Sequence, residues 1–141
     1  MPVVAAVDQS ERAQSVVQRA KRLADDTGVG LHVVYVGEAA VPSAESGYDA
    51  DREKKLSAQK ATNIARGIGQ DVVAIEEFEP VGLEGNPAEE LLKHSTAEDA
   101  EYIVVSARKR SPVGQAVFGS VTQSLLLNAD RPVVAVPHAT E

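Results

Sequence analysis

The chain has 141 residues, a formal net charge of −7 and no cysteine, which excludes disulfides, thiolate catalysis and cysteine-ligated zinc. The acidic balance argues against a general nucleic-acid binder, whose affinity rests on basic residues, and no stretch approaches the ~20 apolar residues of a membrane-spanning helix. Because 43% of the residues are hydrophobic, we expect one domain over residues 1–141, and the lack of a signal-peptide pattern favours a cytoplasmic protein.

The chain begins with an apolar run followed by a helical pattern. Val3–Val7 is continuously apolar, as expected for a strand of a parallel sheet that is covered on both faces. Asp8 ends this strand, and Ser10 is predicted to cap the following helix. The apolar residues of that helix recur at helical spacing as far as Gly28, which is expected to stop it.

A second strand and a second helix follow. Leu31–Val36 is the next apolar run, and a polar loop over residues 37–49 separates it from a helix predicted over about residues 50–68. A third strand is expected to begin at Val72 and to run towards Phe78.

The second half repeats the alternation. Asn86 is a residue type favoured at a helix N-cap, and Pro87 follows at the first helical position. Tyr102–Val105 is the fourth predicted strand, Ser120–Asn128 the last helix and Val133–Val136 the fifth strand. Such alternation indicates a doubly wound α/β fold, with a parallel sheet and helices on both faces.

Ligands of doubly wound sheets bind beyond the carboxyl ends of the strands. Asp8, Val36 and the loop that begins at Ser106 all lie at such ends. The loop leads to Gly119 and Ser120, where the free N–H groups of a helix N-terminus favour phosphate. Ser120 and Gln123 have capping-box spacing, so Ser120 is the predicted N-cap, and an ordinary capped helix remains an alternative to a ligand site.

Four motifs resemble the universal stress protein family, and they are spread over nearly the whole chain. They are Val4–Ser10, Gly85–Glu90, Phe118–Thr122 and Arg131–Pro137. The resemblance implies an adenine-nucleotide α-hydrolase-like fold, a five-stranded parallel sheet of order 3-2-1-4-5. It also implies a homodimer, often formed through the last strand, and a protein that binds ATP or AMP in some members and not in others.

The ATP-binding members share a signature of Gly, two residues, Gly, nine residues, then Gly followed by Ser or Thr. Its positions fall on Ser106, Lys109, Gly119 and Ser120, of which the last two match. Ser106 could donate to a sugar hydroxyl in place of the first glycine. Lys109 carries a Cβ where the second glycine lies near phosphate, but its ammonium could contact phosphate itself.

The same resemblance implies further contacts for a nucleotide. The Ala6 and Val7 backbone and Asp8 would line the adenine side, and the Val36 backbone would hold the adenine edge. Arg108 would point towards phosphate, and the Val121 N–H would lie at the helix mouth. A plain strand-end turn remains the alternative for Asp8.

Other chemistries find little support in the sequence. His32, His94 and His138 lack metal-ligand spacing, so no metal site is expected. Neither a P-loop nor a dinucleotide fingerprint is present. The sequence shows no clear general base or metal cluster, so no catalytic residue is predicted. If the protein is an enzyme, a slow ATPase is the most that we expect.

Two functions therefore remain. The first is a dimeric regulatory module of the stress response that binds ATP or AMP, with Mg²⁺ as a possible companion. The second is a nucleotide-independent dimeric stress or scaffold protein that acts through protein partners. In both, the short, uncharged Val133–Val136 is an expected edge strand that a second copy would cover, with a polar covering loop as the alternative.

Overall fold

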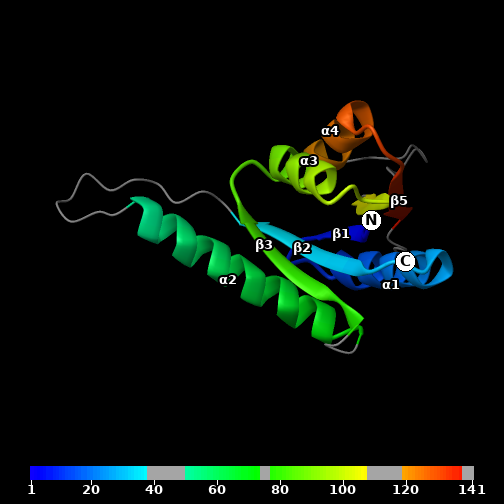
Figure 1. The fold of residues 1–141 in the computed structure, drawn as a ribbon, viewed down its shortest axis with the longest axis horizontal. Coiled ribbons are helices and arrows are strands. Elements are labelled where there is room, and N and C mark those ends of the chain that lie inside the picture. The colour runs from blue at the N-terminus through cyan, green and yellow to red at the C-terminus, as the bar shows by residue number, and fades with distance from the viewer. Residues whose placement is uncertain (38–49, 74–76, 108–118, 138–141) are drawn as a thin grey trace, which may run out of the picture.

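The computed structural model describes residues 1–37, 50–73, 77–107 and 119–137. Strands and helices alternate along it, as Figure 1 shows. In chain order they are β1 (Val3–Val7), α1 (Arg12–Thr27), β2 (Leu31–Gly37), α2 (Ala50–Gln70), β3 (Glu79–Glu84), α3 (Pro87–Ala97), β4 (Tyr102–Ala107), α4 (Ser120–Asn128) and β5 (Val133–Pro137).

The five strands form one sheet of order β3-β2-β1-β4-β5, and every neighbouring pair is parallel. The predicted fold class and strand order are therefore confirmed. β1 lies at the centre, where Val3 pairs with Leu31 on one side and with Tyr102 on the other. The first half of the chain adds β2 and β3 on one side of β1, and the second half adds β4 and β5 on the other side. A crevice is therefore expected between β1 and β4, beyond their carboxyl ends.

Helices cover both faces of the sheet (Figure 1), and each face has its own core. Val3 and Ala5 pack with α1 residues such as Val17, whereas Val4 packs on the other face with Leu91 of α3. Alternate side chains of a strand point to opposite faces, so a strand buried on both must be apolar throughout. This explains the unbroken run of β1.

The third strand differs from the prediction. It is Glu79–Glu84, not the run from Val72 to Phe78, because α2 continues to Gln70 and Val72, Val73 and Phe78 pack in the core rather than in the sheet. Val72 packs, partly buried, on the α1 side. β3 is an edge strand, which explains how it accommodates Pro80, a residue without an N–H to donate.

Gly82 permits an unusually close approach between β3 and α2. A Cβ at this position would lie closer than 3.0 Å to backbone atoms of Ala58, Ala61 and Thr62 in α2. Figure 1 shows α2 lying along β3 at the edge of the sheet. The glycine therefore sets how closely the long helix packs on the edge strand.

Two predicted helix ends are confirmed. Gly28 ends α1 in the left-handed region, at φ 70°, where glycine carries no Cβ penalty. Asn86 is the N-cap of α3, and its side chain accepts a hydrogen bond from the Glu89 N–H at 3.1 Å.

Two predicted N-caps are wrong by one residue. The N-cap of α1 is Glu11, although the Ser10 hydroxyl does accept a hydrogen bond from the Arg12 N–H. The N-cap of α4 is Gly119, because its carbonyl accepts the first intrahelical bond from the Gln123 N–H and Ser120 is already helical. Among the described helices, none has both the length and the apolar character needed to cross a membrane.

Candidate functional site

A cavity of about 360 Å³ opens at the carboxyl ends of β1, β2 and β4, beside the N-termini of α1, α3 and α4. Its volume lies within the range of about 300–1,000 Å³ typical of small-molecule sites. The lining residues are Ala6, Val7, Asp8, Gln9, Arg12, Val34, Tyr35, Val36, Pro87, Leu91, Val105, Ser106, Gly119, Ser120, Val121 and Thr122.

Most of the predicted site residues meet in this cavity. Those that line it are Ala6, Val7, Asp8, Val36, Ser106, Gly119, Ser120 and Val121. The other two, Arg108 and Lys109, lie outside the described residues. Residues more than a hundred positions apart in the sequence are thus brought together by the parallel sheet, whose strands all end at one edge.

Asp8 is held by a local network at the end of β1. Its carboxylate accepts hydrogen bonds from the Ser10 N–H, at 2.9 Å, and from the Ser10 hydroxyl, and Arg12 Nη2 lies 3.6 Å from its second oxygen. Partial burial raises the pKa of Asp8, but the Ser10 hydrogen bonds and the Arg12 charge outweigh it and hold the pKa below its usual value. Asp8 therefore makes the strand-end turn and also lines the cavity as an anion.

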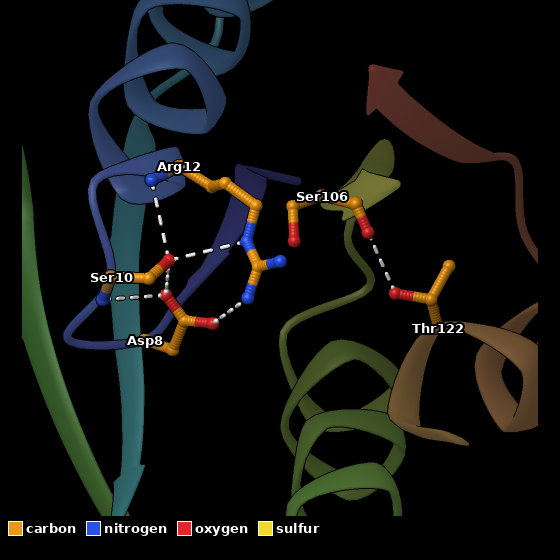
Figure 2. A network of polar contacts seen from close by, with 5 residues as sticks. All are labelled: Asp8, Ser10, Arg12, Ser106 and Thr122. Carbon is orange, nitrogen blue, oxygen red and sulfur yellow. Dashed lines mark hydrogen bonds and ion pairs between the residues drawn. The ribbon is translucent and has the colours of Figure 1, made fainter. Parts of the chain in front are cut away.

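Arg12 is a cavity residue that sequence reasoning missed. Its Nε donates to the Ser10 hydroxyl at 3.3 Å, and Figure 2 shows its guanidinium group between Asp8 and Ser106. Asp8 and Arg12 are the charged side chains among the described residues that line the cavity. A basic residue one turn beyond the first strand was the available signal, but i,i+4 pairs with Asp are common on any helix surface.

A part-buried hydrogen bond joins the carboxyl end of β4 to the first turn of α4. The Thr122 hydroxyl, in a residue only 6% exposed, donates to the Ser106 carbonyl oxygen at 2.9 Å. Figure 2 shows the Ser106 side chain on the other side, towards Arg12. The Ser106 hydroxyl and the Arg12 guanidinium group therefore face the same space.

The N-terminus of α4 provides donors to the cavity. Gly119 is extended, with φ −71° and ψ 165°, and no side chain of the described residues caps the helix. The Ser120 and Val121 N–H groups precede the first intrahelical bond and so have no partner within the helix. With the partial positive charge of the helix dipole, they form an environment that suits an anion.

Apolar side chains also line the cavity. They include Val34, Val36 and Leu91, and Tyr35 lines it too, with its hydroxyl donating to Gln9 Oε1 at 3.1 Å. Apolar side chains combined with N–H donors and a guanidinium group suit a ligand with an apolar part and an anionic part. Asp8 is a poor general base here, since its lowered pKa reduces its affinity for a proton.

Comparison with known proteins places this cavity in context. The model of the universal stress protein family matches residues 1–137. A universal stress protein of Mycolicibacterium smegmatis is 37% identical over 125 residues, which cover 86% of this chain and 84% of that protein.

Solved structures share the fold as well. A universal stress protein from Archaeoglobus fulgidus superposes with a TM-score of 0.65 at 29% identity, over 96% of this chain and 97% of that one. A structure of the universal stress protein from Archaeoglobus fulgidus in complex with dAMP gives a TM-score of 0.59 at 24% identity, over 96% of each chain. The fold is thus the adenine-nucleotide α-hydrolase-like fold of these structures.

Proposed function

The chain belongs to the universal stress protein family, and on this basis we propose that it is a regulatory module of the stress response that binds ATP or AMP. The observation that carries the proposal is the convergence of the β1, β2 and β4 ends with the N-terminus of α4 in one cavity. This cavity combines an apolar wall with donors for an anion, which are the two features that an adenine nucleotide requires.

The adenine base belongs on the side of β1 and β2. There the Ala6 and Val7 backbone, Asp8 and the Val36 backbone offer polar atoms around an apolar surface. A base placed there is stabilised by burial of its faces and selected by hydrogen bonds to its edge.

The phosphates belong at the mouth of α4. Gly119 leaves room for close approach, and the Ser120 and Val121 N–H groups point along the helix axis towards the cavity. Arg12 adds a guanidinium group suited to phosphate, and Ser106 a hydroxyl within reach of the sugar. Arg108 and Lys109 are proposed to complete the phosphate contacts, and Mg²⁺ to accompany ATP.

A solved structure of similar fold contains an adenine nucleotide. The universal stress protein of Archaeoglobus fulgidus has been solved in complex with dAMP. At 24% identity this similarity concerns the fold alone, so the proposal that this chain binds a nucleotide depends on its own cavity.

Calorimetric titration of the purified protein with Mg-ATP and with AMP tests the proposal. We expect saturable binding of one nucleotide per chain. Gly119→Val should weaken it, because the backbone at 119 accepts any residue without strain and the added side chain would fill the space for phosphate. Gly30→Ala is the matched control, since nothing lies within 4 Å of its added Cβ.

The alternative is a nucleotide-independent dimer that acts through protein partners. It predicts no heat with either nucleotide, and binding that appears only when Ser106→Gly and Lys109→Gly restore the family's two glycines. Binding by the native chain that Gly119→Val abolishes would exclude this alternative.

We propose further that two copies pair through β5. The strand lies at the edge of the sheet, and Val133–Val136 are only partly buried. α4 packs beside it and carries Leu127, which is 76% exposed. Among the described residues, no strand pairs with the outer side of β5, and an apolar edge of this kind favours pairing with another chain.

Light scattering tests the dimer. Native protein should have twice the 14.9 kDa mass of one chain, and Val134→Lys should reduce it to that of one chain. Because Val134 also packs on the core, Leu127→Glu is a second variant that changes an exposed residue. A mass that neither variant alters would remove β5 and α4 from the interface.

A single domain over residues 1–141 and a cytoplasmic location complete the proposal. One cooperative unfolding transition, followed by two independent probes, is the expected behaviour of a single domain. Cell fractionation with detection of the native chain tests the location.

A further inference from the structure

Two histidines 62 positions apart in the sequence face each other across the interface between β2 and α3. His32 Nδ1 lies 3.1 Å from His94 Nε2, and the rings are tilted by 46°. The His32 side chain is only 12% exposed, and His94 is half-buried. The fold thus brings together two histidines whose separation in the sequence did not indicate a common site.

A carboxylate orients the first histidine. Glu79 Oε2, on β3, lies 2.9 Å from His32 Nε2. The Nε2–H of His32 therefore donates to Glu79, and the lone pair of Nδ1 is directed towards His94. Carboxylate, imidazole and metal in this order is the usual arrangement around histidine ligands, because the carboxylate fixes the tautomer and raises the basicity of the ring.

Glu98 adds a third potential ligand. It follows His94 by four residues at the C-terminal end of α3, and the donor atoms of His32, His94 and Glu98 all lie within 4.8 Å of one another. We propose that these three residues bind a divalent transition-metal ion, with Zn²⁺ as the best-fitting ion and water completing its coordination.

The distances fit this ion. Two nitrogen ligands at about 2.0–2.1 Å from a tetrahedral Zn²⁺ are separated by about 3.3 Å, close to the 3.1 Å between the two imidazoles. Two histidines and one carboxylate are a common ligand set for zinc, with a position left open for water. Glu98 is exposed, so its side chain can move towards the ion without repacking the core.

The surroundings favour a cation. The carbonyl groups at the C-terminus of α3 carry partial negative charge, and Glu79 and Glu98 together match the two positive charges of the ion. The alternative is a simple hydrogen bond between the rings through one proton, which a metal ion would replace.

This site is separate from the proposed nucleotide site. His32 is the second residue of β2 and lies at the amino end of the strand, whereas the cavity lies at the carboxyl ends. The metal proposal therefore stands or falls independently of nucleotide binding.

Metal titration of untagged, chelator-treated protein tests the proposal. One equivalent of Zn²⁺ should bind in competition with a chromophoric chelator, and Co²⁺ should give the intense visible bands of a four-coordinate site. His94→Gln and Glu98→Gln should abolish both signals, whereas His138→Gln, a change of the remaining histidine, should leave them unaltered. Circular dichroism and Tm of each metal-free variant establish that it is folded.

The outer carboxylate gives a graded test. Glu79→Gln should weaken Zn²⁺ binding by about 10- to 100-fold without abolishing it. Zn²⁺ should also raise the Tm of the native protein, because it joins β2 to α3. Absence of stoichiometric binding, or binding of equal strength in His94→Gln and Glu98→Gln, would overturn the proposal.

Discussion

The Thr122 hydroxyl donates a hydrogen bond to the Ser106 carbonyl oxygen at 2.9 Å and thereby joins the first turn of α4 to the end of β4. The two residues are 16 positions apart, and the contact holds the N-terminus of α4 at the cavity that Ser106 and Arg12 also line; Figure 2 shows the Ser106 hydroxyl directed towards Arg12. This hydrogen bond sets the position of the proposed phosphate site relative to the sheet.

Thr122→Val should therefore reduce both stability and nucleotide affinity. Valine keeps the shape but removes the donor, and loss of a part-buried hydrogen bond costs about 0.5–1.5 kcal/mol of unfolding free energy. Urea unfolding and calorimetric titration measure the two effects. Thr27→Val removes an exposed hydroxyl at the end of α1 and should change neither by a comparable amount; equal effects in both variants would contradict the role of Thr122.

Arg12→Gln should weaken nucleotide binding while the fold is retained. A hydrogen bond to a charged group contributes about 1.5–3 kcal/mol, which corresponds to a loss of affinity of about tenfold or more. Titration of the variant with Mg-ATP measures it. Arg19→Gln, an exposed change on the same helix, controls for net charge, and an equal loss there would show that Arg12 acts only through the overall field.

Asp8 should contribute to stability at neutral pH and lose that contribution in acid. Because the folded pKa of Asp8 lies below its usual value, the contribution is present above the unfolded pKa, about 3.9, and disappears as pH falls through the folded pKa. With a side chain 54% exposed, the effect should stay below about 1 kcal/mol.

Urea unfolding of native protein and Asp8→Asn at a series of pH values measures this contribution. The difference between the two should be largest near neutral pH and should close in acid, while Asp26→Asn, at an exposed position of α1, should not reproduce it. A difference that grows as pH falls would contradict the prediction.

Gly82→Ala should destabilise the protein markedly. The new Cβ would meet backbone atoms of α2, and backbone cannot move aside as a flexible side chain can. Overpacking of this kind costs about 1–3 kcal/mol or more, measured as a lower urea midpoint. Gly30→Ala adds a Cβ into open space and should leave the midpoint almost unchanged; a Gly82→Ala midpoint equal to the native one would show that α2 shifts without cost.

The sequence predicted the α/β class from periodicity alone, because strands buried on both faces must be apolar throughout. It failed at β3, where the apolar run from Val72 resembled a strand more closely than Glu79–Glu84 does. An edge strand pairs with a neighbour on one side only, so it accommodates Pro80, whereas Gly82 is required by the close approach of α2. Together these residues remove the continuous apolar pattern that identifies a central strand.

The residues of the candidate site were also predicted only in part. Asp8, Val36 and Ser106 were predictable, since all carboxyl ends of parallel strands meet at one edge. Arg12 was not, because only its side-chain direction, set by Asp8 and Ser10, brings it into the cavity. The pairing of His32 with His94 depends on how α3 packs on β2. The spacing of residues along the sequence cannot predict this packing.

α3 connects the two proposed sites, because Pro87 and Leu91 near its start line the cavity and His94 near its end belongs to the histidine pair. Its 11 residues span about 16 Å at 1.5 Å per residue, as one rigid rod. An occupant that tilts or slides this rod at one end changes the geometry at the other. Thermodynamic linkage then requires reciprocity: whatever factor a nucleotide imposes on metal affinity, the metal imposes on nucleotide affinity.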